Sequence, residues 1–138
     1  MKKSRMLKSL FMMVLALGIL TGGGALSSAS GGPYTSYVLK PLGGNNYTNF
    51  HTKSQDSDWL LNKVTALTNT TAANFWGEYD GLITTETISA KYTQKVATTY
   101  TTISFYRNVK AGSNVRLAME NANVSTSNAF VSGDVEFW

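Results

Sequence analysis

The sequence predicts an all-β fold, a small antiparallel β-sandwich or an open barrel, preceded by a signal-peptide helix. The chain is rich in Thr, Ser, Asn and Gly and carries seven Tyr, six Phe and three Trp, a composition that favours strands joined by turns. Turn-forming residues recur often enough to separate about seven to nine short strands. The absence of cysteine excludes disulfide bonds, a cysteine nucleophile and a thiolate metal site.

Residues 1–30 are typical of a secretory signal peptide. Cationic side chains come first, followed by an uninterrupted apolar run over residues 10–20 and then by glycines and other small residues. The cationic residues are Lys2, Lys3, Arg5 and Lys8. The apolar run is shorter than the roughly 20 residues needed to span a bilayer, which argues against a retained membrane anchor.

Signal cleavage is expected at the small residues that end this segment, namely Ala29, Ser30 and Gly31. The predicted organisation is therefore a signal peptide over residues 1–30 and one secreted β-domain over residues 31–138. We expect the protein to be extracellular. Contact with the membrane is expected only through the signal peptide during export.

The predicted mature domain has no net charge. The whole chain contains 12 Lys and Arg against 8 Asp and Glu, but four of the basic residues lie in the signal segment, which leaves 8 against 8. The basic character of the whole chain therefore comes from the signal peptide. A neutral domain with scattered charges lacks the basic surface that nucleic acids attract, so we expect no nucleic-acid partner.

The first two predicted strands cover residues 34–39 and 47–53. Pro41 and the Gly- and Asn-rich residues 43–46 separate them, as is typical of a turn. Residues 31–33, Gly-Gly-Pro, form a leader before the first strand.

Residues 57–68 fit two alternatives. Leu60, Val64 and Leu67 have the spacing of a helix, whereas a strand would place every second residue on one face. The alternating set is Trp59, Leu61, Lys63, Thr65 and Leu67. We favour the strand because the surrounding sequence is rich in Thr and other strand-forming residues.

The next strands lead to the clearest alternation in the chain. Residues 73–79 form a strand that ends at the Asp80-Gly81 turn, and residues 82–90 alternate more weakly. Residues 96–109 alternate throughout, with Ile103 and Phe105 on one face. Ile103 is therefore expected to be buried.

The last two predicted strands cover residues 115–119 and 129–138, joined by the polar residues 121–128. Alternation directs Val115, Leu117 and Met119 into the core. Within the last strand, Gly133 and Asp134 indicate a bulge or a turn.

The C-terminal third carries a distinctive pattern. Residues 115–123 read VRLAMENAN and, after a short polar loop, residues 130–135 read FVSGDV. This pattern resembles the C-terminal signature, V-x-L-x-A-E-N-x-N followed by V-S-G, of a bacterial family of small secreted proteins that carries only a domain-of-unknown-function label. Trp59 and the pair Phe75-Trp76 match aromatic positions in earlier strands of that family. The departures from its pattern are Met119, Ala122 and Val135.

The resemblance implies an exported protein of a Gram-positive bacterium with an all-β fold. It transfers no catalytic residue, ligand or cofactor to this chain.

Two weak candidates for chemistry lie near each other in the sequence. His51, the one histidine, could pair with a serine and with Asp56 or Asp58 in a hydrolase, but no G-x-S-x-G motif is present. Asp56 and Asp58 could contribute to a calcium site, but the longer EF-hand pattern is missing. We therefore expect no catalytic residue and no metal ligand here.

A stronger candidate is the stretch that contains Trp76, Glu78, Tyr79 and Asp80. Two carboxylates beside aromatic rings are typical of glycosidase sites, and alternation places Glu78 and Asp80 on one face of a strand. Because Asp80-Gly81 is also an ordinary turn, we expect a ligand-facing platform rather than a catalytic pair.

The function predicted from these observations is non-enzymatic binding outside the cell, with a cell-surface glycan or protein as partner and no cofactor. Two alternatives remain open. A bacteriocin-like antagonistic peptide is disfavoured by the neutral mature domain, since membrane-directed peptides are usually cationic. A small cell-wall-directed hydrolase requires Glu78, Asp80 or His51 to lie in a concave pocket.

Overall fold

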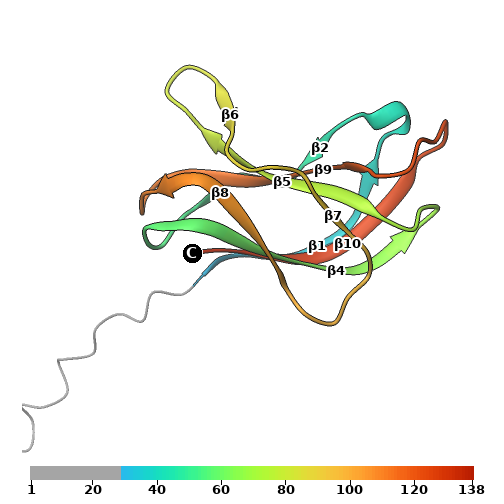
Figure 1. Cartoon of the computed structure of the whole chain (residues 1–138), viewed down its shortest axis with the longest axis horizontal. Helices are drawn as coiled ribbons and strands as arrows, with labels where there is room; N and C mark the ends of the chain where they lie inside the picture. The colour runs from blue at the N-terminus through green and yellow to red at the C-terminus, as the bar shows by residue number, and fades with distance from the viewer. Residues whose placement is uncertain (1–28) are drawn as a thin grey trace, which may run out of the picture.

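The computed structural model describes residues 29–138 and confirms the predicted all-β class, with two antiparallel sheets packed together as a sandwich (Figure 1). The expected signal-peptide helix lies outside the described residues. Sheet A has the strand order β1-β10-β4-β8, and sheet B has the order β2-β9-β5-β6, with β3 also paired to β9 and β7 to β5. Within residues 29–138, no helix has the length and apolar character needed to cross a membrane.

The elements are β1 (Ser30–Leu39), the 3-10 helix η1 (Pro41–Gly43), β2 (Asn46–Tyr47), β3 (His51–Thr52), β4 (Ser57–Thr68), β5 (Ala73–Asp80), β6 (Thr85–Thr87), β7 (Tyr92–Gln94), β8 (Thr101–Val109), β9 (Asn114–Asn121) and β10 (Ala129–Phe137). The four strands of sheet A are all long, whereas in sheet B only the two central strands, β9 and β5, are long and the others have two or three residues. Figure 1 shows the β5–β6 hairpin projecting beyond the sandwich.

Residues 57–68 form the predicted strand, β4, but Leu67 does not share a face with Trp59, Leu61 and Lys63 as expected. The inward-facing residues are Leu60, Asn62 and Val64, and the outward-facing ones are Trp59, Leu61 and Lys63. Ser132 pairs with Ala66 whereas Gly133 pairs with Val64, so Thr65 is an extra residue that forms a bulge. The bulge reverses the alternation, and Leu67 packs against the core instead of continuing the outer face.

Three predicted strands are shorter than expected. Residues 47–53 split into β2 and β3, because the Thr48 hydroxyl accepts a hydrogen bond from Leu117 N–H and interrupts the ladder. Residues 82–90 contribute only the three residues of β6. Residues 96–100 precede β8 and carry the chain from sheet B to sheet A, so they cannot belong to one straight strand.

The core confirms the predicted inward faces of β8 and β9. Ile103, Val115, Leu117 and Met119 have no exposed surface, and Phe105 is 7% exposed. The two sheets interlock through Phe105, because a methyl group at Gly77 of β5 would approach its ring to 2.7 Å. The absence of a side chain at that position therefore allows close contact between β5 and β8.

A line of polar side chains crosses this apolar core. Tyr34 of β1 donates its hydroxyl proton to Asn62 Oδ1 of β4 at 3.0 Å, and Asn62 Nδ2 donates to Gln94 Oε1 of β7 at 3.0 Å. All three residues are buried, and burial raises the pKa of Tyr34 well above its usual value. We call these three residues the polar line; it joins sheet A to sheet B.

Lys53, which follows β3, is a second buried polar group. The residue is 2% exposed, and its ammonium donates to Ser57 Oγ and lies 5.4 Å from the centre of the Phe105 ring. Among residues 29–138, no carboxylate forms an ion pair with it. Burial lowers the pKa of Lys53 to about 8, partly opposed by the more distant Asp56 and Asp58.

This burial predicts a specific pH dependence of stability. Below pH 8 Lys53 carries its proton in both the folded and the unfolded state, so the cost of burying the charge is fully present. Between pH 8 and the ordinary pKa of 10.5, the unfolded state binds more protons than the folded state. The free energy of unfolding therefore rises with pH over this range. Replacing Lys53 by Met should increase the free energy of unfolding at pH 7 by roughly 1–3 kcal/mol and much less at pH 10. Urea unfolding at both pH values measures this difference.

The exposed Lys95 provides the matched control, since Lys95→Met should change stability little at either pH. An equal effect of Lys53→Met at pH 7 and pH 10 would contradict the assignment of a buried ammonium.

Candidate functional site

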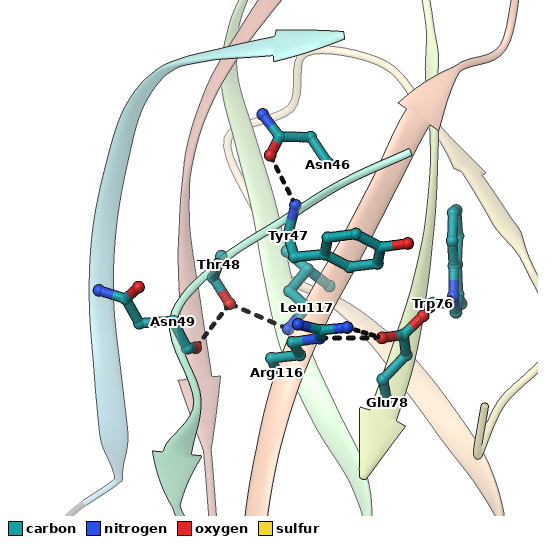
Figure 2. A network of polar contacts seen from close by, with 8 residues as sticks. All are labelled: Asn46, Tyr47, Thr48, Asn49, Trp76, Glu78, Arg116 and Leu117. Carbon is teal, nitrogen blue, oxygen red and sulfur yellow. Dashed lines mark hydrogen bonds and ion pairs between the residues drawn. The ribbon is translucent and has the colours of Figure 1, made fainter. Parts of the chain in front are cut away.

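Trp76 and Glu78 of β5 lie on the outer face of sheet B and contact each other. The Trp76 indole Nε1 donates to Glu78 Oε1 at 3.1 Å, and Arg116 of β9 donates to Glu78 Oε2 from Nε and Nη2 at 2.8 and 2.7 Å (Figure 2). Trp76 is 3% exposed and Glu78 is 7% exposed. Both predicted site residues therefore belong to a buried hydrogen-bond network and do not form an open surface.

Aromatic rings from the β2–β3 segment cover the cation of this network. The Arg116 guanidinium carbon lies 3.9 Å from the centre of the Tyr47 ring and 4.7 Å from that of Phe50. Cation–π contacts of this kind add to the ion pair because the cation is largely shielded from water. We call Tyr47, Phe50, Trp76, Glu78 and Arg116 the clasp; it fixes the β2–β3 segment against β9 and β5.

The clasp limits what Glu78 can do chemically. Both of its carboxylate oxygens already accept hydrogen bonds, one from Trp76 and the other from Arg116 in a nearly buried ion pair. A glycosidase acid must instead hold a proton beside an open sugar site. The geometry of Glu78 fits a structural role.

Tyr79 and Asp80 take no part in the clasp. Tyr79 faces the opposite side of β5 and packs against the core, with the Arg107 guanidinium 5.2 Å from its ring centre. It lines an open depression under the β5–β6 loop together with Glu86 and Arg107, which pair with each other at 2.9 Å. Asp80 is exposed at the end of β5. The structure thus separates the four predicted residues, and a ligand at Tyr79 and Asp80 stays a prediction.

Asp56 stabilises a turn. Its Oδ2 accepts from Lys110 Nζ and its Oδ1 from the Ala111 N–H, both at 2.8 Å, and these two hydrogen bonds lower the pKa of Asp56. Asp58 is exposed. In the part of the chain that the structure describes, no three His, Asp or Glu side chains gather as metal ligands.

The two edges of the sandwich differ. At one edge, β8 is joined to sheet B by the Tyr106 N–H, which donates to Ile88 O at 2.8 Å, and by a bridge between Ser89 and Phe105. At the other edge, β1 borders the β2–β3 segment without forming a ladder. Within residues 29–138, two side-chain hydrogen bonds join these strands, Asn46 Nδ2 to Val38 O at 2.9 Å and Ser30 Oγ to Thr52 O at 2.7 Å.

A hollow of about 200 Å³ lies between these two hydrogen bonds. Buried Tyr34 and Val135 line its inner part, half-buried Tyr37 and His51 line its sides, and Asn49 is exposed at its rim. The remaining lining residues are Gly31, Gly32, Pro33 and Thr48. We call this site the edge hollow.

A bulge in β1 creates one wall of the edge hollow. Tyr34 pairs with Gly133 and Tyr37 with Val131, so β1 contains one extra residue, and Ser36 adopts a left-handed φ of 53°. Residues three apart in a regular strand face opposite sides. The bulge places both tyrosines on the inner side, with their rings edge to face at 5.7 Å.

His51 forms the other wall. Its ring stacks on Phe137 with 5.0 Å between ring centres and an interplanar angle of 16°, and burial lowers the pKa of His51 below 6.5. The imidazole is therefore neutral at pH 7. Among the described residues, no hydrogen-bond partner satisfies the His51 ring nitrogens, the Tyr37 hydroxyl or the Asn49 amide.

No protein-family model, curated protein or solved structure matches this chain. The site is therefore assigned from its geometry. Sequence reasoning considered His51 only as a catalytic residue and missed Tyr37 and Asn49, because their proximity depends on the β1 bulge and on the break between β2 and β3. The expectation of a leader over residues 31–33 is wrong, because Gly31, Gly32 and Pro33 belong to β1 and pair with β10. Pro33 was the available signal, since a proline within a strand indicates a sheet edge.

The clasp predicts that Glu78 contributes more to the stability of the fold than Glu86 does. Glu78→Gln removes the charge that Arg116 and Trp76 contact in a buried setting, and it should lower the free energy of unfolding by roughly 1–3 kcal/mol. Glu86→Gln removes the exposed partner of Arg107 and should cost less than about 0.5 kcal/mol. Urea unfolding compares the two variants, and equal costs would show that the clasp does not stabilise the fold.

Proposed function

We propose that this chain is a secreted, non-enzymatic binding domain that acts outside the cell by attaching to a cell surface. The signal-like segment over residues 1–30 and the resemblance to small secreted proteins of Gram-positive bacteria support export. The position of Ser30 is compatible with cleavage after Ala29, since β1 would then keep its first residue and the hydrogen bond from its hydroxyl to Thr52 O.

The edge hollow is the single observation that carries the binding proposal. It brings three polar side chains without protein partners together with aromatic walls, which is the ordinary composition of a ligand site. No carboxylate lines it beside His51, so a His-carboxylate pair for hydrolysis is missing from this site. Binding without chemistry is the function that fits these residues.

The test uses purified, fluorescently labelled protein added to intact Gram-positive cells. We expect saturable retention of the label with the membrane potential unchanged and no release of soluble wall fragments. Retention with loss of potential would replace the proposal by an antagonistic peptide, and release of wall fragments would replace it by a hydrolase. Absence of retention on every cell type would contradict surface binding.

A further inference from the structure

We propose that the edge hollow binds a single ring of a neutral saccharide, held between Tyr37 and His51 and hydrogen-bonded by Asn49. This inference rests on the proposed binding function and names the ligand class of the same site. It follows from the charge, the dimensions and the exposed chemical groups of the hollow.

The lining residues favour an uncharged ligand. None of the nine described residues around the hollow carries a carboxylate, an ammonium or a guanidinium group. His51 is neutral at pH 7 because burial lowers its pKa. A charged ligand would lose its hydration there without gaining an opposite charge, which is costly.

The ends of the hollow exclude an extended peptide. A peptide strand lying between β1 and the β2–β3 segment would have to continue past both ends of the gap. One end is closed by the hydrogen bond from Asn46 to Val38 and the other by that from Ser30 to Thr52. The volume of about 200 Å³ is also below the ~300–1,000 Å³ of pockets for drug-sized ligands, so it suits a group of one ring.

The chemical groups match a sugar ring. Such a ring has C–H faces, which pack against aromatic side chains, and an edge of hydroxyl groups that both donate and accept hydrogen bonds. Tyr37 and His51 supply the aromatic surface, and each also carries a polar atom at the ring edge. The Asn49 amide donates and accepts at the rim, and Figure 2 shows it pointing away from Arg116 and Glu78.

Preorganisation supports the same conclusion. The clasp holds the β2–β3 segment from the outer side of sheet B, and the polar line holds Tyr34 and hence β1 from the core. Both walls are therefore fixed before a ligand arrives, which reduces the entropy lost on binding.

His51 provides the probe, because it is the only histidine in the sequence and its two ring C–H signals stand alone in a proton–carbon NMR spectrum. We would titrate purified protein with maltotriose, cellotriose and triacetylchitotriose. At least one of them should shift the His51 signals saturably. Tyr37→Phe and Asn49→Ala, which each remove one polar group, should weaken that binding about fivefold or more.

Matched controls keep the result specific. Tyr106→Phe and Asn108→Ala change the same residue types at exposed positions of β8 and should leave the affinity unchanged. A dispersed amide spectrum establishes that each variant is folded. Equal weakening by the controls would contradict the assigned site.

The experiments can contradict the saccharide inference and the proposed surface-binding function independently of each other. Cell retention of the label with no response of His51 to any of the saccharides would overturn the saccharide inference and leave surface binding intact. A saturable His51 response without retention on cells would support the site and contradict the surface function. If tetra-alanine shifts the His51 signals and the saccharides do not, the ligand is a peptide and the inference is wrong.

Discussion

The packing of Tyr34 over Gly133 is the constraint on which the rest of the structure depends. The tyrosine ring crosses β10 at a residue without a side chain and reaches Asn62 on the far neighbour, and Asn62 continues the polar line to Gln94 in sheet B. Hydrogen bonds in a dry core are costly to lose, because each unpaired group keeps its full desolvation penalty. Both neighbours of β10 accommodate this crossing with a bulge at the same level, one in β1 and one in β4.

The candidate site is a consequence of that arrangement. The β1 bulge sends Tyr37 to the inner side of the strand, and the clasp independently positions His51 by fixing the β2–β3 segment. Two strands that are each held by other contacts border one another without a ladder, and the space between them is the edge hollow. The opposite edge of the sandwich is closed by backbone hydrogen bonds, so the edge hollow lies at the edge where, within residues 29–138, only side-chain hydrogen bonds join the two sheets.

Local alternation predicted much of the fold. It predicted the strand character of β4 and the inward faces of β8 and β9, since buried residues recur at period two in each strand, Ile103 and Phe105 in β8 and Leu117 and Met119 in β9. It missed the β4 bulge that turns Leu67 inward and the passage of residues 96–100 between sheets, because both depend on partners distant in the sequence. At the site, alternation places Trp76 and Glu78 on one face, but the ion pair of Glu78 with Arg116 and the contact of Arg116 with Tyr47 and Phe50 are tertiary effects.

The most direct test of this account is the Gly133→Ala variant, because the added methyl would overlap the Tyr34 hydroxyl and the Lys63 carbonyl oxygen. Urea unfolding should show a loss of about 2–5 kcal/mol, since the buried Asn62 would lose its tyrosine partner and strand contacts would shift. The His51 ring signals should also move, because Tyr34 lines the edge hollow. Wild-type stability together with unchanged His51 signals would contradict the claim that this crossing holds the sandwich and shapes its site.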